Sequence, residues 1–353
     1  MAMRKVLLIM VLSAVLGAIM TAPAEAASVR RSSAWLPYWS MSTALSRVLN
    51  NADLFHTASP FWYNATACDT ISGYSGAGST SVIDALRRKG IRVVPTVSAS
   101  GLTPAKAISC FANATNRAAH VRRLVAIAKS RAYSGLDLDY EHLALTTDVA
   151  VAKRVRAAFT ALARDLCSSM HSLGKTCSIT VMPRTSTSFT VWRGKLMPAV
   201  YDYAPLGAMS DRLRLMAYDQ HAGKGAGPIA GYPWVQAIAR FARSEVAAGK
   251  VELGIPLYGR DFTPTGSRAV ISAKAASLAS SHNATIRFDA TQRESTATWT
   301  SSGVKHVLWW SSARAVGDRV TLARASGFAG TAFWAAGQED GSTWSTVRAR
   351  YQP

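Results

Sequence analysis

Three carboxylates stand at alternate positions in one short stretch of the chain. Asp137, Asp139 and Glu141 alternate with apolar residues in the run Ser134-Gly-Leu-Asp-Leu-Asp-Tyr-Glu. Because side chains alternate between the two faces of a β-strand, the three acids are expected on one face. Crowding of like charges raises the pKa of at least one acid, as a general acid at neutral pH requires. The pattern predicts acid–base catalysis; a solvated acidic edge strand or a cation site is the alternative.

The segments that must position these acids alternate between two kinds. Short apolar or β-branched runs predict strands, and amphipathic stretches such as Ser81–Lys89, Asn116–Ser130, Ala150–Leu173 and Trp234–Gly249 predict helices. The expected strands are Ala34–Trp39, Phe55–Phe61, Ile91–Val97, Gly135–Tyr140, Cys177–Met182, Leu213–Tyr218, Val251–Leu257 and Gly330–Trp334. Such alternation predicts the α/β class and a (β/α)8 TIM barrel, with catalytic groups at the C-terminal ends of its strands.

The stretch between the seventh and eighth strands is too long for one loop and one helix. It contains short strand-like runs at Ala284–Asp289, Ser295–Thr300 and Lys305–Trp310. We therefore expect a small inserted subdomain over approximately residues 262–312. Residues 27–353 as a whole are expected to form one catalytic barrel, because no linker or repeat divides them.

The N-terminus has the order of a secretory signal peptide. Arg4 and Lys5 precede the apolar run Val6–Met20, which is followed by small residues. Residues 1–26 are therefore predicted to be a signal peptide, and the protein to be secreted, in the extracellular space or the cell wall. An uncleaved membrane anchor is the alternative, although the run is short for a spanning helix. No later stretch predicts membrane insertion.

The chain has four cysteines, an even number that favours two disulfides in an exported protein. Three pairings are open. Cys167 and Cys177 lie between an expected helix end and the next strand, so we pair them and leave Cys68 with Cys110. None of the four lies in a metal-binding spacing, and no metal or cofactor is expected.

The formal net charge is +20, and loss of the leader would leave +19. Such a surface attracts polyanions. The basic residues are scattered and form no nucleic-acid-binding motif, so nucleic acid is not the expected partner. Anionic cell-wall polymers are the expected partners of an exported chain, and a merely soluble basic surface is the alternative. The protein is expected to be a monomer.

Together, several motifs resemble glycoside hydrolase family 18, the chitinase family. Its Asp-x-x-Asp-x-Asp-x-Glu signature is matched at Asp137, Asp139 and Glu141, while Ser134 replaces its first Asp. Three further segments look like the ends of its last strands, namely Leu215–Asp219, Leu253–Gly259 and Gly330–Trp334. The resemblance covers roughly residues 33–351. The stretch 218–234 is most similar to the branch of bacterial spore-cortex-lytic enzymes, which are peptidoglycan N-acetylglucosaminidases.

The resemblance implies a role for each matched residue. Glu141 would protonate the glycosidic oxygen and later activate water. Asp139 would orient the substrate's 2-acetamido group, which acts as the nucleophile in this family, and Asp137 would tune the proton of Asp139. Tyr218 would hold the acetamido oxygen. The expected sugar contacts are Asp219, Met216 and Trp334, whose ring would stack on the sugar at the cleavage site.

Aromatic residues complete the expected substrate site. Five of them lie at the ends of the first two predicted strands and could line sugar subsites, with Tyr38 and Trp62 as the chosen candidates; packing in the core is the alternative reading. The five are Tyr38, Trp39, Phe61, Trp62 and Tyr63. The predicted function is that of a secreted glycoside hydrolase that cleaves β-1,4 linkages in a polymer containing N-acetylglucosamine, either chitin or peptidoglycan. A non-catalytic, chitinase-like glycan-binding protein is the alternative, although such proteins typically lack the acid found here as Glu141.

Overall fold

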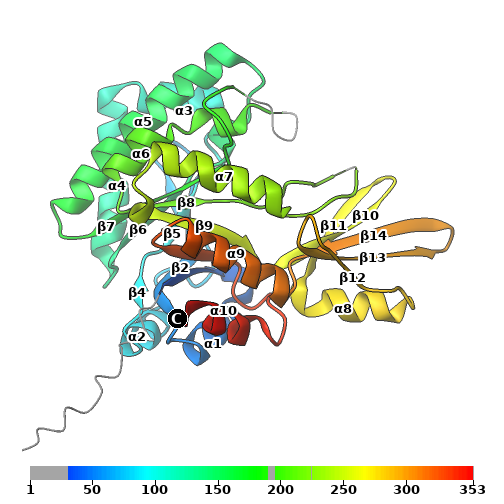
Figure 1. The fold of residues 1–353 in the computed structure, drawn as a ribbon. Coiled ribbons are helices and arrows are strands. Elements are labelled where there is room, and N and C mark those ends of the chain that lie inside the picture. The colour runs from blue at the N-terminus through cyan, green and yellow to red at the C-terminus, as the bar shows by residue number, and fades with distance from the viewer. Residues whose placement is uncertain (1–30, 190–194, 224, 353) are drawn as a thin grey trace, which may run out of the picture.

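A closed barrel of parallel strands forms the body of the molecule (Figure 1). The computed structural model describes residues 31–189, 195–223 and 225–352, so the predicted signal peptide lies outside the described residues. Around the barrel the order is β1, β2, β5, β6, β7, β8, β9 and β15, and β15 pairs with β1. The bounds are Ser32–Pro37, Phe55–Ala65, Thr96–Ser98, Gly135–Asp139, Thr176–Val181, Arg212–Leu215, Val251–Pro256 and Gly330–Trp334. The predicted (β/α)8 barrel is confirmed.

One predicted strand is interrupted. The expected run Ile91–Val97 consists of β4 (Arg92–Val93) and β5, and both pair with β2. Pro95 lies in the break, where it has no N–H to give to a neighbouring strand. Its carbonyl oxygen still accepts the Asp137 N–H at 3.0 Å, which fixes β6 beside the break. A short antiparallel strand, β3 (Ile71–Gly73), also pairs with β2.

Helices cover the outside of the barrel, so the apolar core lies between the strands and the helices. Asp148 begins the long helix α5, because its carboxylate accepts the N–H groups of Ala150 and Val151. No helix in the described ranges is long and apolar enough to cross a membrane. The helices are α1 Met41–Asn50, α2 Thr80–Arg88, α3 Pro104–Phe111, α4 Ala114–Ser130, α5 Val149–His171, α6 Tyr203–Met209, α7 Tyr232–Glu245, α9 Ala313–Ala325 and α10 Thr343–Tyr351.

A second, antiparallel sheet forms the inserted subdomain between β9 and β15. In Figure 1 it projects from the barrel on the side away from α3 and α4. Its order is β11, β10, β14, β13 and β12, and α8 packs against it. The bounds are Tyr258–Thr263 for β10, Gly266–Ile271 for β11, Ser272–Ser281 for α8, Arg287–Asp289 for β12, Glu294–Ser301 for β13 and Val304–Trp310 for β14. The subdomain therefore begins at Tyr258, before the predicted start near residue 262. β10 begins only two residues after Pro256, the last residue of β9, so no turn sequence separates the barrel from the subdomain.

The two disulfides join the barrel strands to the helices that cover them. Cys68, in the loop after β2, bonds Cys110 of α3, and Cys167 of α5 bonds Cys177 of β7. The predicted pairing is therefore confirmed. At the end of the chain, Arg348 of α10 forms an ion pair with Asp53 just before β2, which ties the last helix to the first barrel strands.

Polar groups fill much of the barrel interior. Branched apolar residues are usual inside such barrels. Here Asp137, Arg214 and Glu252 project inward from β6, β8 and β9, and each is at most 1% exposed. The buried hydroxyl groups of Ser59, Thr96 and Thr180 surround them. These groups are shielded from bulk solvent, so their hydrogen-bond and ion-pair partners within the barrel determine their charge and position.

Candidate active site

The three predicted acids lie in line along β6 and the residues that follow it. Asp137 is fully buried, Asp139 is 5% exposed, and Glu141, just beyond the strand, is partly exposed. The line therefore runs from the barrel interior outward to its C-terminal mouth. The side chains between them, Leu138 and Tyr140, are buried in the outer core. The two-residue period of the strand thus separates an acidic face from an apolar face.

Asp137 is held from four other strands. Its Oδ2 accepts the Trp35 Nε1–H at 2.9 Å and the Thr96 hydroxyl at 2.8 Å, and it lies 3.2 Å from Arg214 Nη1. Its Oδ1 accepts the Thr180 hydroxyl at 2.9 Å. Four donors, one of them cationic, surround this carboxylate and fix its position.

Asp139 has the opposite environment. Burial raises its pKa well above the ordinary value, and the nearby Glu141 and Asp137 raise it further, while Arg214 opposes them. Its Oδ1 has no hydrogen-bond partner among the described residues. Burial, together with an oxygen that accepts no hydrogen bond, favours the protonated form. One proton is therefore most stable on Asp139, between a bonded carboxylate below it and Glu141 above it.

Tyr218 and Asp219 follow β8, and Tyr218 lies near the same acids. Burial, with Asp139 and Glu141 next in importance, raises the pKa of Tyr218 well above its usual value, so its hydroxyl stays a neutral donor. Asp219 has a positive φ of 58°. Its carboxylate accepts the Tyr258 hydroxyl at 2.7 Å and two N–H groups of Arg260 at 3.1 and 3.2 Å. The inserted subdomain thus fixes Asp219 through its first strand.

Aromatic rings gather at the ends of β1, β2 and β15. The Trp334 ring lies 6.1, 6.3 and 5.6 Å from the rings of Trp35, Trp39 and Phe61, respectively. Trp39 is 56% exposed, and Trp334 is partly exposed. The predicted residue Tyr38 is also partly exposed and stacks on Tyr74 at 4.2 Å. This wall offers rings that are open to solvent beside the buried acids, as sugar binding requires.

The prediction for Trp62 is wrong. Trp62 is fully buried and packs in the outer core with Tyr133, because it points to the other face of β2. Its neighbour Phe61, another of the five candidates, lies toward Trp334 instead. Met216 is buried just after β8, where its N–H donates to Val181 O. It lies on the inward face with Arg214 and Tyr218, by the strand's alternation.

Several residues that hold the acids in place were not predicted from the sequence. Trp35, Thr96 and Thr180 bond Asp137, and Tyr258 and Arg260 bond Asp219. Arg214 and Glu252 could have been found from the sequence, because each is a charged residue within an otherwise apolar strand. The runs Leu-Arg-Leu at 213–215 and Val-Glu-Leu at 251–253 each bury their charge in the barrel. The hydroxyl and aromatic donors gave no such signal, because these residue types are common at strand ends.

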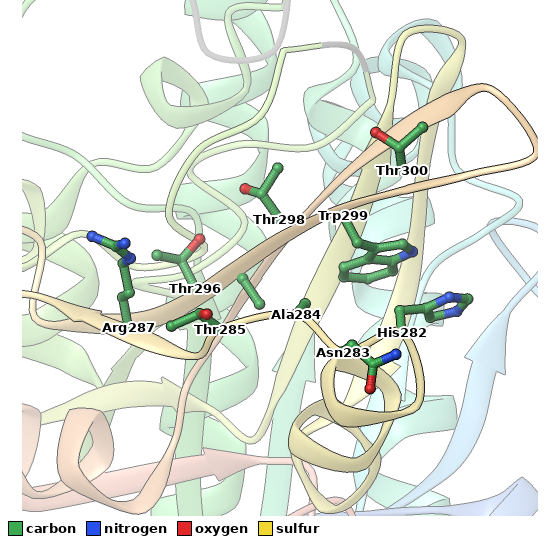
Figure 2. Close-up of a pocket in the computed structure, with 10 residues that line it drawn as sticks. His282, Asn283, Ala284, Thr285, Arg287, Thr296, Thr298, Trp299 and Thr300 are labelled. Carbon is green, nitrogen blue, oxygen red and sulfur yellow. The ribbon is translucent and has the colours of Figure 1, made fainter.

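A separate groove lies on the inserted subdomain and contains none of the predicted site residues. Figure 2 shows its lining of threonines from β13, the turn after α8, Arg287 and Trp299. The groove has a volume of about 470 Å³. Trp299 is sandwiched between His282 and His306, each 5.0 Å from its ring and nearly parallel to it. Both faces of this indole are therefore covered, and the groove presents no open ring on which a sugar could stack.

The barrel, the acidic strand and the aromatic wall define a glycosidase, and comparison identifies its family. The model of glycosyl hydrolases family 18 matches residues 61–339, and the chain belongs to this family. It is a chitinase-like glycosidase related to spore-cortex-lytic enzymes.

Individual relatives agree with this assignment. The chain is 29% identical over 203 residues to the cortical fragment-lytic enzyme of Bacillus anthracis, covering 55% of this chain and 46% of that one. The chain thus spans about half the length of this curated relative. The crystal structure of a chitinase from Chromobacterium violaceum superposes with a TM-score of 0.81 at 25% identity, covering 92% and 99% of the two chains. The spore cortex-lytic enzyme SleL of Bacillus cereus shares the fold, with a TM-score of 0.79 at 20% identity over 91% and 74% of the chains.

Proposed function

We propose that this protein is a secreted glycosidase that cleaves β-1,4 linkages in chitin or peptidoglycan, with the substrate's own 2-acetamido group as nucleophile. The observation that carries the proposal is the gradient of environments along β6. Asp137 is saturated with donors, Asp139 is buried without a partner for Oδ1, and Glu141 is partly exposed at the mouth. β6 and the residues just after it thus provide a carboxylate held by several donors, a buried carboxyl that keeps its proton, and an accessible acid.

Glu141 is the residue placed to exchange protons with a substrate. It is the outermost of the three acids and the only partly exposed one. Asp139, next to it on the same face, is close enough that each carboxyl disfavours ionisation of the other. Such coupling keeps a proton available in the pair near neutral pH. We assign Glu141 as the general acid for the leaving oxygen and as the general base for the incoming water.

The nucleophile in this proposal comes from the substrate. A carboxylate nucleophile must be ionised and accessible. Asp139 is buried, and the pKa of its carboxyl is raised, so it is a poor nucleophile. Asp219 is engaged by Tyr258 and Arg260. An acetamido oxygen placed by the neutral Tyr218 hydroxyl would attack the anomeric carbon instead, while Asp139 receives the acetamide N–H. The reaction would retain the anomeric configuration.

The aromatic wall supports a sugar polymer as the substrate. Trp334 and Trp39 offer ring surface beside the acids, and the apolar C–H faces of sugars pack on such rings. Relatives point to two polymers, because one is named a chitinase and another a cortical fragment-lytic enzyme. Secretion is supported by the leader-like N-terminus and by two disulfides, which form in oxidising compartments.

Product analysis on matched substrates tests the proposal. Purified enzyme is incubated with chitin oligomers, with purified peptidoglycan and with glucose oligomers of the same length, and the products are identified by mass spectrometry. NMR of the fresh products gives the anomeric configuration. We expect cleavage with retention next to N-acetylglucosamine and none with glucose, which lacks the acetamido group. Equal cleavage of the glucose oligomers would refute substrate assistance, and binding without any cleavage would favour the glycan-binding alternative.

A further inference from the structure

A row of charged side chains, Asp137, Arg214 and Glu252, crosses the barrel interior. Arg214 of β8 is 1% exposed and lies between two carboxylates. Its Nη1 is 3.2 Å from Asp137 Oδ2, and its Nε is 3.0 Å from Glu252 Oε2. Nη1 also donates to the Ser59 hydroxyl at 2.7 Å, which fixes the plane of the guanidinium. The cation therefore has a single position, between Asp137 and Glu252.

Glu252 anchors this guanidinium from the other side. Its Oε2 also accepts the Ser33 hydroxyl at 2.6 Å, and its Oε1 lies 3.1 Å from His56 Nε2. Burial alone would raise its pKa, but Arg214 and then His56 outweigh burial and hold the pKa of Glu252 well below the ordinary range. Glu252 is thus an anion, and its charge retains the Arg214 cation deep in the barrel.

A buried arrangement of this kind is not explained by stability. Replacing a buried ion pair by well-packed apolar residues is often neutral or stabilising, and most barrels of this fold fill the same space with branched apolar side chains. The arrangement does have a local effect on the acids. Asp137 receives a full positive charge from below, whereas Asp139, two residues further out, accepts no hydrogen bond at Oδ1 from the described residues.

We propose that Arg214 is a positioning residue for hydrolysis. It holds Asp137 as the carboxylate from beneath and so leaves the single proton of the acid pair on Asp139, while Glu252 keeps Arg214 in place. This inference rests on the proposed function, because it concerns the proton that Asp139 and Glu141 use there. Arg214 does not touch the substrate. Its effect is on which acid carries the proton when substrate enters.

Among the described residues, few other charged or titratable groups lie near Asp137, Arg214 and Glu252. Asp137 faces Asp139 and Glu141 from its own strand, Arg214 from β8 and Tyr218 from the segment after β8. Arg214 faces Asp137, Glu252 and, through space, Asp139 of β6 and Arg92 of β4. Glu252 additionally faces His56 of β2 and Arg212 of β8. Arg214 is the cation in contact with Asp137, so its removal has the largest expected effect on the acid pair.

The pH profile of the intact enzyme tests the inference. Arg214→Met combined with Glu252→Gln removes both charges, so that Glu252 is not left as a buried anion without Arg214, and Asp137 keeps only its neutral donors. An opposite charge in contact changes the pKa of a carboxyl by about 1 to 3 pH units. We therefore expect the acid limb of kcat/KM, which reports the free enzyme, to move to higher pH by at least about one unit. On that limb kcat/KM would fall about tenfold or more. Arg214→Lys keeps the charge and should restore much of the acid limb.

A second buried pair provides the matched control. Arg319 of α9 and Glu294 of β13 are both fully buried and 3.7 Å apart, outside the acid cluster. Arg319→Met with Glu294→Gln makes the same chemical change there, and it should lower stability without moving the acid limb. Circular dichroism and thermal melts establish how much of each variant is folded.

The outcomes separate this inference from the function on which it rests. If wild-type enzyme releases no products from chitin oligomers or peptidoglycan, the proposed function fails. If wild-type enzyme is active and the folded Arg214→Met/Glu252→Gln variant keeps the wild-type acid limb, the role of Arg214 is refuted. If that variant does not fold, Arg214→Lys decides. Lys cannot contact Asp137 and Glu252 through two separate nitrogens, so its acid limb should still move upward, by less than one pH unit, and an unchanged limb would refute the role.

Discussion

Asp139 should lower the stability of the folded protein at neutral pH, and Asp139→Asn should raise it. The side chain is 5% exposed, and burial with the neighbouring Glu141 and Asp137 raises its pKa well above the ordinary value. In the unfolded chain the same carboxyl ionises near pH 3.9. The folded state keeps its proton to higher pH, so the native state becomes less stable, relative to the unfolded state, as pH rises through this window.

The size of the effect follows from the same linkage. Each pH unit between the two ionisations corresponds to about 1.4 kcal/mol. An Asn side chain has nearly the shape of the protonated acid and never ionises. We therefore expect Asp139→Asn to gain about 1–3 kcal/mol at pH 7, a rise of several degrees in Tm, while hydrolysis is lost. The gain should shrink as pH falls toward 4, where the unfolded chain also holds the proton about half of the time.

Urea denaturation at pH 4, 5.5 and 7 measures this dependence. Asp211 provides a control of opposite sign. Partial burial alone would raise its pKa, but hydrogen bonds from the Cys177 N–H and from His171 lower it. Asp211→Asn should therefore reduce stability at pH 7 by a few tenths to about 1 kcal/mol, and the loss should fade as pH decreases. If Asp139→Asn is destabilising at pH 7, or its gain does not grow with pH, the assignment of a proton to Asp139 is wrong.

Two further results are expected. Tyr258→Phe and Arg260→Met each remove a donor to Asp219. Each variant should lower kcat/KM on a chitin oligomer by about tenfold, which corresponds to about 1.4 kcal/mol of lost transition-state stabilisation. A wild-type kcat/KM in either variant would show that Asp219 does not need that donor. The +19 surface predicted for the mature chain should bind intact cell walls in a manner that weakens steeply between roughly 0.05 and 0.5 M salt, with much less effect on hydrolysis of a short neutral oligosaccharide; equal retention on walls stripped of anionic polymers, without salt dependence, would contradict this.

The fold could be predicted from the sequence because each unit repeats one pattern. The alternation of strands and helices predicts a parallel barrel, and each of the eight runs overlaps a barrel strand, although Pro95 interrupts one of them and several bounds differ by two to four residues. The line of three acids followed from the two-residue period of β6. The disulfide pairing followed from the short separation of Cys167 and Cys177, which leaves one choice for the other two.

The partners of the acids could not be predicted in this way. Trp35, Thr96, Thr180 and Arg214 reach Asp137 from four strands, and their meeting depends on the stagger of strands around the barrel rather than on any local pattern. The misplaced Trp62 has a local cause. Three successive aromatic residues give no polar–apolar alternation to show which one faces inward, and the pairing of β2 with β5 is irregular at that point.

The turnover of Glu141→Gln tests the central claim most directly. Gln keeps the shape of the side chain and removes its acid, so the fold and substrate binding should be preserved. On an unactivated N-acetylglucosamine polymer, release of reducing ends should fall by at least ~10²-fold, the lower range for loss of a general acid, with unchanged circular dichroism and melting. A folded Glu141→Gln enzyme that retains most of the wild-type turnover would contradict the assignment of Glu141 as the catalytic acid.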